Sequence, residues 1–390
     1  MRRGAAWLDS VRSQVAFAAA APPRARAGDD FDWEWFATRG PRAWAPPAPG
    51  DAFSSEWLAA HGERLWDVRE RLADDTSRLV FDLHLVLRGA GPARFCFPRP
   101  EFTDWLVVHG REPFAAEGLP ADYLGQPLEV FDLTVADTGT RVRLVATALQ
   151  VGLCNAYRQY VPTRGGTPLG PGPGDVVLDC GACIGDFGTL FAALVGAGGA
   201  VHLFDPVPLH GRYCRHQMAL NPHLAPLLHP VQAAVGAASM SVSGATGDVE
   251  RVSPGGLAVD AYEQVSLDDY AAAAQLARVD FVKMDIEGAE LDALAGAGHC
   301  LARDRPRLAI SAYHRPEHLW EIPAAIIPVG HTFKLHSGRG AHAVDSAAQI
   351  SLYLGSSDPI WNNGSDRATI YDRFGRVVDS RDHAVERPNP

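Results

Sequence analysis

The spacing of hydrophobic residues changes along the chain near residue 175. From about Phe53 to Arg88, apolar residues recur in steps of three and four, at Leu65, Val68, Leu72, Leu79, Leu83 and Val86. This spacing predicts an amphipathic helix or a helix pair whose apolar side packs against other parts of the protein. From Glu129 to Val151, two runs of β-forming residues flank a turn signal at Asp137 to Gly139, which predicts a hairpin.

Downstream of Asp175, short apolar runs alternate with amphipathic segments. The pattern predicts strands at 176–180, 201–204, 231–235, 281–284 and 307–311, and helices at 186–195, 209–220 and 289–297. This alternation predicts an α/β fold with a doubly wound, mostly parallel sheet. Runs at 332–336 and 349–354 predict an antiparallel edge. In such a sheet, ligands bind at the carboxyl ends of the strands.

These patterns divide the chain into four parts. Clustered Pro, Gly and small residues within positions 1–50 predict a mobile N-terminal arm. Residues 51–150 form a helical and hairpin region, which we expect to cover the substrate side of the α/β domain. That domain spans residues 151–355, and residues 356–390 are expected to form a surface tail.

Composition narrows the class of protein. Of the 390 residues, 47% are hydrophobic and 21% are charged, which is sufficient for a sizeable folded core. The 46 acidic residues outnumber the 35 basic ones, so neither a nucleic acid nor an anionic membrane is expected as a partner. Six cysteines are too few for a secreted disulfide framework, and there is no run of 18 apolar residues. We therefore expect a cytoplasmic protein.

The first segment with chemical character is VVLDCGACIGDFG, residues 176–188, between a predicted strand and a predicted helix. Gly181 and Gly185 allow a sharp turn, and the helix start offers free N–H groups to a nucleotide-like ligand. The dinucleotide fingerprint needs glycine where Cys183 and Asp186 stand. Asp186 would also repel a pyrophosphate, whereas it would tolerate a cationic cofactor without phosphate, such as S-adenosylmethionine.

Acidic residues follow two other predicted strands. Asp205 comes directly after the strand at 201–204, where a carboxylate can accept hydrogen bonds from ribose hydroxyls. Asp285 and Glu287 follow the strand at 281–284. Charged side chains at the carboxyl ends of strands are an active-site placement in this architecture.

The strings KMDIEGAE at 283–290 and YHRPEHLW at 313–320 carry a resemblance to a known family. Over residues 174–354, about half of the chain, the sequence resembles the FkbM-type S-adenosylmethionine-dependent methyltransferases. The resemblance implies a Rossmann-like class I methyltransferase fold and S-adenosylmethionine as cofactor. Because members of this family mostly methylate hydroxyl groups, it also implies an O-methyltransferase that acts on a small molecule or a glycan.

The resemblance also assigns residues to the cofactor site. The loop residues Asp179, Gly181, Cys183 and Gly185 are similar to the family's cofactor loop, although Cys183 stands where Asn is commonest. Asp205 resembles the family's ribose-binding acid, here Asp in place of Glu. Asp268, within SLDDY, is expected to contact the adenine, and Asp285 is expected to lie near both the cofactor and the reacting atoms.

Two residues are candidates for the base that removes the hydroxyl proton, His314 and Asp285. The ordinary histidine pKa of about 6.5 favours His314 near neutral pH, although a structural histidine would fit the sequence as well. A divalent cation at Asp285, with or without Glu287 as a second ligand, is an alternative, but two carboxylates are an incomplete ligand set and no metal site is predicted. The remaining acids of this region are expected at the solvent-exposed surface: Glu290, Asp292 and Glu317.

Three other interpretations are weighed against methyl transfer to oxygen. The spacing Cys180-Gly-Ala-Cys183 suggests a redox pair, but Cys180 falls inside a predicted strand. A nucleic-acid methyltransferase is disfavoured because DIEG stands where such N-methylating enzymes usually carry an Asn or Asp followed by two prolines and an aromatic residue. A catalytically silent cofactor-binding or scaffold module stays open, as do the acceptor and the oligomeric state.

Overall fold

The structure is a computed structural model of the 390-residue chain. It describes residues 2–20, 53–90, 111–123, 126–156, 158–164, 167–243, 261–326, 332–337, 350–355, 367–371 and 377–382.

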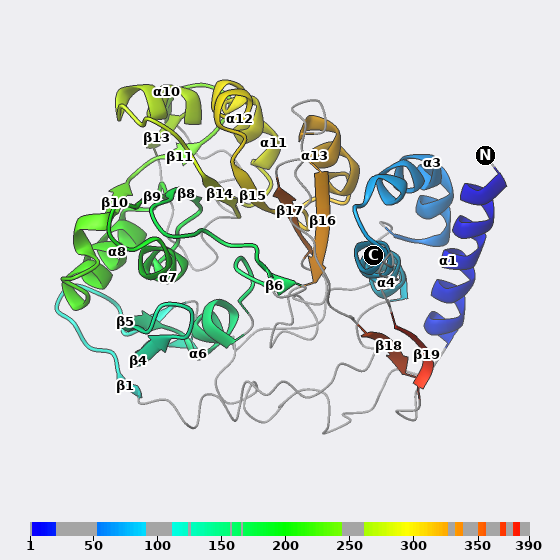
Figure 1. Cartoon of the computed structure of the whole chain (residues 1–390), viewed down its shortest axis with the longest axis horizontal. Coiled ribbons are helices and arrows are strands. Elements are labelled where there is room, and N and C mark those ends of the chain that lie inside the picture. Colours follow the sequence, from blue (N-terminus) through cyan, green and yellow to red (C-terminus); the bar gives the residue numbers. More distant parts are fainter. Residues whose placement is uncertain are drawn as a thin grey trace, which may run out of the picture.

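A seven-stranded sheet forms the centre of the α/β domain (Figure 1). Its spatial order is β10 (Leu228–Val231), β9 (Ala200–Phe204), β8 (Val176–Cys180), β14 (Phe281–Met284), β15 (Arg307–Ser311), β17 (Ile350–Gly355) and β16 (Thr332–Ser337). The first five strands are parallel, and β17 runs antiparallel to both of its neighbours. The predicted mostly parallel sheet with an antiparallel edge is therefore confirmed.

Side chains of the central strands alternate between two apolar cores. Val177 and Phe281 point into the core that α7 (Asp186–Val195) and α8 (Pro208–Leu220) cover. Leu178 and Val282 point into the opposite core. There the sheet is covered by α10 (Leu267–Ala273), α11 (Glu290–Ala295), α12 (Gly298–Asp304) and α13 (His318–Ile326) (Figure 1). Because both faces are buried, these strands read as continuous apolar runs.

One predicted strand differs from the structure. The sequence predicts a single strand at 231–235, but the chain ends β10 at Val231 and turns there, with Ala233 donating its N–H to the carbonyl of Val231. The next residues form β11 (Ala234–Val235), which joins a second sheet with β13 (Ala261–Val265) and β12 (Met240–Ser243). The apolar run is thus shared between two sheets.

Three helices lie beside the sheet: α1 (Arg2–Ala20), α3 (Ser55–Arg71) and α4 (Asp75–Ala90). The predicted helix pair is confirmed as α3 and α4. For residues 2–20 the prediction of a mobile arm is wrong, because Val11 and Val15 are almost fully buried against the other two helices. Their four-residue spacing gives α1 an apolar stripe. Residues 21–50 lie outside the described part of the chain.

The helical region is joined to the α/β domain through α13. The ring of Trp320 on α13 lies 5.7 Å from Trp57 and 5.1 Å from His61, both on α3. These contacts make one continuous apolar core from the three N-terminal helices to the sheet. They also fix the start of α13, which follows the loop that carries His314.

The predicted hairpin is confirmed as β4 (Glu129–Val135) and β5 (Thr140–Ala146). It packs on α7 and α8, so it belongs to the α/β domain and not to a separate unit. The amide side chains of Gln217 in α8 and of Asn221, which directly follows that helix, bind the free edge of β5. Gln217 bonds both the N–H and the C=O of Val145, and Asn221 does the same for Arg143.

The remaining described elements are short. They are β1 (Arg111–Pro113), β2 (Asp122–Tyr123), β3 (Gln126–Pro127), α6 (Ala148–Val151), the π-helical turn η2 (Gly152–Ala156), β6 (Thr163–Arg164), β7 (Thr167–Pro168), the 3-10 turn η3 (Ala225–Leu227), β18 (Arg367–Tyr371) and β19 (Val377–Asp382). β18 and β19 form a hairpin within the predicted surface tail. Among the described helices, none has both the length and the apolar character needed to cross a bilayer.

Candidate active site

The loop after β8 lies tightly against the end of β14. Gly181 has a φ of +81°, and a Cβ there would lie 2.0 Å from the carbonyl oxygen of Asp285. Only glycine fits this position, because any side chain would collide with the backbone. Gly185, at φ +85°, begins α7. The two glycines thus bring the cofactor loop, the start of α7 and Asp285 to one place, as the sequence predicts.

A buried ion pair connects the two central strands below this loop. Lys283 of β14 lies opposite Asp179 of β8, with 3.1 Å between Nζ and Oδ1. Lys283 also donates to the carbonyl of Gly181 at 2.6 Å. Burial opposes the charge of Lys283, but Asp179 and Asp285 outweigh it and raise the pKa of the lysine. Sequence reasoning missed Lys283, although a lysine inside an apolar strand signals a buried partner.

The buried charge around the loop suits a cationic ligand. Asp179, Asp186 and Asp205 are buried here and Asp285, 24% exposed, lies beside them, whereas Lys283 is the buried lysine among them. The carboxylate of Asp179 has no hydrogen-bond partner in the described residues beyond its ion pair. Burial raises the pKa of Asp186 to about 6. Such an excess of buried acid is costly without a counter-charge, and a sulfonium or ammonium group would supply one.

Asp205 lies directly after β9 and is almost fully buried. Its Oδ1 accepts from the N–H of Val207 and from Nδ1 of His210, both at 2.9 Å. Its Oδ2 accepts from the N–H of Cys183 at 3.0 Å. The structure therefore brings Asp205 to the cofactor loop. A carboxylate can accept about four hydrogen bonds, which leaves capacity for a ligand hydroxyl.

Asp285 is held at the end of β14 by two tyrosines. Tyr160 donates to Oδ2 at 2.7 Å and Tyr313 donates to Oδ1 at 2.9 Å. Tyr160 is fully buried and also bonds Ser311 of β15. Tyr160 could not be recognised from the sequence, because it lies in an irregular segment without periodicity.

His314 lies beside Asp285, as the sequence predicts for neighbouring strand ends. Its Nε2 is 3.4 Å from Asp285 Oδ1 and 3.6 Å from Glu287 Oε2. Its Nδ1 is 2.8 Å from Oε1 of Glu290. The expectation that Glu290 is solvent-exposed is wrong, since the side chain is fully buried. Glu290 also lies 3.4 Å from His318 and accepts from the N–H of Ile286.

This acidic surrounding changes the protonation of His314. Burial alone would lower the pKa of the ring, but the carboxylate of Glu290 at 2.8 Å and the charges of Asp285 and Glu287 outweigh it and raise the pKa to about 9. For Asp285, burial would raise the pKa, yet His314 and Lys283 lower it. At neutral pH the site therefore holds an imidazolium beside a carboxylate. The ordinary histidine pKa assumed from the sequence does not apply here.

Asp268 has a different surrounding from the other predicted cofactor residues. Its Oδ2 accepts from the N–H of His299 and its Oδ1 from the N–H of Cys300, both at 2.8 Å. These are the first N–H groups of α12, so Asp268 stabilises that helix start. Figure 1 shows α10 and α12 side by side. The hydrogen bonds of the structure thus join Asp268 to α12 and not to the cofactor loop.

The two cysteines of the C-x-x-C spacing lie in surroundings that disfavour a thiolate. Burial raises the pKa of Cys180 and of Cys183 well above the ordinary value. A redox pair needs a thiolate at neutral pH, so this alternative loses its support. Cys183 contacts Oη of Tyr123 with its Sγ, at 3.1 Å.

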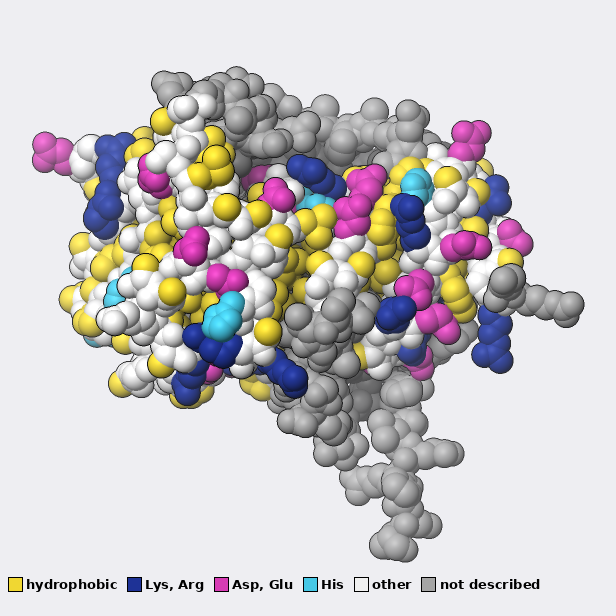
Figure 2. All heavy atoms as spheres, turned by 90° about the horizontal axis from the view of Figure 1, so that it is seen from above, with side chains coloured by type: hydrophobic (Ala, Val, Ile, Leu, Met, Phe, Trp, Pro, Cys, Tyr) yellow, Lys and Arg dark blue, Asp and Glu magenta, His cyan; other side chains and the backbone are white. Residues whose placement is uncertain are grey.

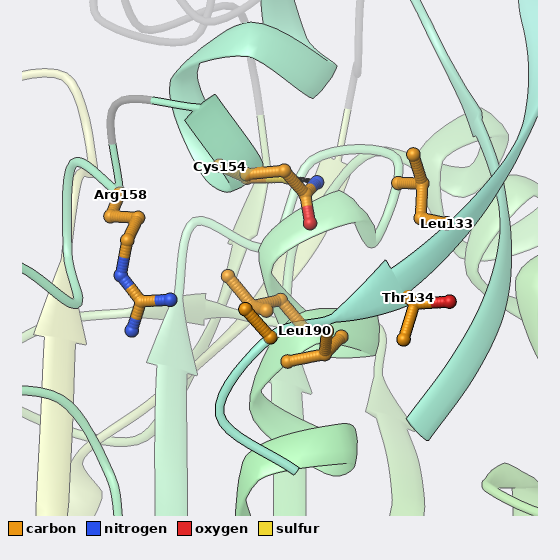
Figure 3. A pocket seen from close by; sticks show the side chains of 8 residues that line it. Leu133, Thr134, Cys154, Arg158 and Leu190 are labelled. Atoms are coloured by element: carbon orange, nitrogen blue, oxygen red, sulfur yellow. Dashed lines mark hydrogen bonds between the residues drawn. The ribbon is translucent and has the colours of Figure 1, made fainter. Parts of the chain in front are cut away.

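Two small cavities lie near the sheet. The larger, of about 100 Å³, is bounded by β4, η2, Arg158 and α7, and Figure 3 shows Thr134, Cys154 and Arg158 around it. None of the predicted site residues lines it. A smaller cavity of about 30 Å³ lies against Asp205, between α8 and the residues Val231 and Gln232 that end β10. This second cavity adjoins the place predicted for the ribose.

Residues 179–335 match the family described as the methyltransferase FkbM domain. The chain contains an FkbM methyltransferase domain. The cofactor of this family is S-adenosylmethionine. The site fits that cofactor because it combines the buried negative charge of Asp179, the ribose-accepting carboxylate of Asp205 and the closely packed glycine loop Gly181–Gly185.

Several solved structures are similar to the chain that carries this FkbM domain. An FkbM methyltransferase from Methylobacillus flagellatus is 17% identical with a TM-score of 0.49, covering 78% of this chain and 61% of that one. Our chain thus spans less than two thirds of that protein. Fibrillarin from Aeropyrum pernix, with natively bound S-adenosyl-L-methionine, is 13% identical, with TM-score 0.33 and coverages of 59% and 94%. An O-methyltransferase from Bacillus cereus, in complex with SAH, is 11% identical, with TM-score 0.32 and coverages of 46% and 73%. No curated protein matches the chain.

Proposed function

We propose that this protein is an S-adenosylmethionine-dependent O-methyltransferase that acts on a hydroxyl group of a small molecule or a glycan. The observation that carries the proposal is the pair formed by His314 and buried Glu290. Nδ1 of the ring lies 2.8 Å from a glutamate oxygen, while Nε2 faces the end of β14. A histidine whose one nitrogen is held by a carboxylate can accept a proton at the other, as in hydrolytic triads.

The reaction needs alignment more than covalent catalysis. Bound S-adenosylmethionine supplies a methyl group on a positively charged sulfur, which a hydroxyl oxygen can attack in line. The Gly181–Gly185 loop and Asp205 hold the cofactor, and Asp179 with its neighbouring acids offsets the positive charge. His314 takes the hydroxyl proton on Nε2, and Glu290 keeps the ring in the orientation in which Nδ1 carries its own hydrogen.

The raised pKa of His314 makes the reaction pH-dependent. With a pKa of about 9, only about one ring in a hundred is neutral at pH 7. The neutral ring of His314 can accept a proton and the imidazolium cannot, so kcat/KM should rise with pH until about 9. The groups that face the ring are Glu290, Asp285, Glu287 and His318.

A nucleic-acid substrate receives no support from the charge distribution. Figure 2 shows acidic and basic side chains interspersed over the described part of the face seen from above, without a continuous basic patch there. A phosphate backbone requires such a patch. A small or carbohydrate acceptor does not.

The test is release of S-adenosylhomocysteine from S-adenosylmethionine in the presence of fractionated metabolite and glycan pools. We expect turnover with at least one fraction, and a loss of about 10²- to 10⁴-fold in kcat for His314→Ala with cofactor affinity preserved. His299→Ala, at the exposed start of α12, is the matched control and should keep full activity. Turnover by His314→Ala equal to the parent would eliminate the histidine as the base, and cofactor binding without any turnover would favour the scaffold interpretation.

A further inference from the structure

A closed circuit of hydrogen bonds joins the cofactor loop to the ribose acid through a tyrosine from the N-terminal region. The Sγ of Cys183 lies 3.1 Å from Oη of Tyr123, which lies 3.1 Å from Nε2 of His210. The other ring nitrogen of His210 lies 2.9 Å from Oδ1 of Asp205. Oδ2 of Asp205 accepts the N–H of Cys183, which returns the circuit to its first residue.

Every group in this circuit has a consistent role as donor and acceptor. In the tautomer of His210 that carries its hydrogen on Nδ1, the ring donates to Asp205 and accepts at Nε2 from the hydroxyl of Tyr123. The oxygen of Tyr123 then accepts from the thiol of Cys183. Burial raises the pKa of Cys183 and of Tyr123, so both keep the protons that these roles require. His210 is almost fully buried.

Tyr123 is held in place by the docking of residues 114–123 on α8. Tyr213 donates to the carbonyl of Pro120 at 2.7 Å, and Arg212 donates to the carbonyl of Gly118 at 2.9 Å. The ring of Phe114 packs on Tyr213. Helix α8 begins at Pro208, three residues after Asp205, and carries His210, so this segment is anchored on the helix that places His210 beside the ribose acid.

We propose that Tyr123 and His210 are positioning residues of the cofactor site, which hold Asp205 and the loop at Cys183 in the geometry that receives the ribose. The site thus includes a residue from outside the FkbM match at 179–335. The circuit also gives a role to Cys183, which stands where the family most often has Asn. Holding the loop and the acid together before binding lowers the ordering cost that the cofactor must offset.

The inference is tested by calorimetric titration of the full chain with S-adenosylhomocysteine. Tyr123→Phe removes one hydroxyl from the circuit and should weaken binding about five- to tenfold, since it leaves Nε2 of buried His210 without a donor. Cys183→Ala should weaken binding by a similar factor, and Cys183→Ser should restore it to within about twofold because the serine hydroxyl can donate to Tyr123. Asp205→Ala sets the upper limit, with at least a tenfold loss.

Tyr270→Phe is the matched control. It also deletes a hydroxyl that bonds a histidine, His202 at 2.8 Å, and it lies outside the circuit, so the affinity should not change. Unchanged or tighter binding by Tyr123→Phe would overturn the inference, as would a Cys183→Ser variant no better than Cys183→Ala. If Tyr123→Phe does not fold, the two Cys183 variants decide. A parent protein that does not bind S-adenosylhomocysteine would instead refute the proposed methyltransferase function.

Discussion

In the proposed mechanism, the charge of Glu290 sets the pH at which His314 can act as the base, and Glu290→Gln tests this directly. Glutamine has nearly the same shape and keeps an oxygen that can accept from Nδ1 of His314 and from the N–H of Ile286. The substitution therefore removes one negative charge and leaves the packing of a fully buried side chain almost unchanged. We expect the rising limb of kcat/KM against pH to move to lower pH.

The size of this shift follows from the contacts of His314. Its pKa of about 9, against the ordinary 6.5, corresponds to about 3 kcal/mol in favour of the imidazolium. Glu290 is the nearest acid, at 2.8 Å, and the two others lie at 3.4 and 3.6 Å. Removing the charge of the nearest of these three carboxylates should remove a third to a half of that stabilisation, about 1 to 1.5 kcal/mol, or about one pKa unit. The limb should therefore move from near pH 9 to about pH 8.

The assay is the initial rate of S-adenosylhomocysteine release at low acceptor concentration between pH 6 and 10, since kcat/KM reports the pKa of the free enzyme. Glu317→Gln is the matched control, because Glu317 is a nearby acid without an ion pair to His314 in the structure. In this variant, the rise of kcat/KM with pH should stay near pH 9. A limb that stays near pH 9 in Glu290→Gln would refute the role of Glu290. A rate that falls as pH rises through 9 would show that the imidazolium, and not the neutral ring, is the active form.

Two further outcomes follow from the described contacts. Nε2 of His314 lies within 3.6 Å of both Asp285 and Glu287, and the raised pKa keeps the ring positively charged at neutral pH, so the ring would repel a divalent cation there; EDTA should therefore leave turnover unchanged, and loss of activity that Mg²⁺ or Mn²⁺ restores would contradict this. Val11→Ala should lower the free energy of unfolding by about 2 kcal/mol in urea titration, because Val11 is 1% exposed between α1 and its neighbouring helices. Phe17→Ala on the same helix is the control, at 83% exposed, and an equal loss in both variants would refute the packing of α1.

The sequence predicts the central strands and the loop after β8 well because burial of both faces of the sheet determines where they lie. Strands β8, β14 and β15 are buried on both faces, so each appears as an apolar run, and the acid or glycine that follows marks where the run reaches the ligand edge. Helix α7 begins at Asp186 as predicted, since Gly185 allows the turn that starts it. These features depend only on neighbours in the sequence.

Residues whose role depends on distant contacts could not be predicted in this way. Glu290 occupies a position that an amphipathic helix normally exposes, and only the return of the chain 24 residues later, with His314, buries it. Tyr160 and Tyr123 come from short segments without periodicity, 125 and 60 residues away from the partners they bond. The contacts of Glu290, Asp285 and Glu287 raise the pKa of His314, so the sequence could nominate this residue as a candidate base but could not indicate the pH at which its ring is neutral.

The amide side chains of Gln217 and Asn221 that bind β5 have a consequence for the newly made chain. Without Gln217 and Asn221, the outer edge of β5 offers unpaired N–H and C=O groups at Val145 and Arg143. Such an edge is a template for another strand. During synthesis the hairpin emerges about 75 residues before Asn221, which at ~5–20 residues per second leaves it open for roughly 4 to 15 seconds. In that interval, the edge-to-edge association of nascent chains competes with folding, and the competition ends when α8 forms.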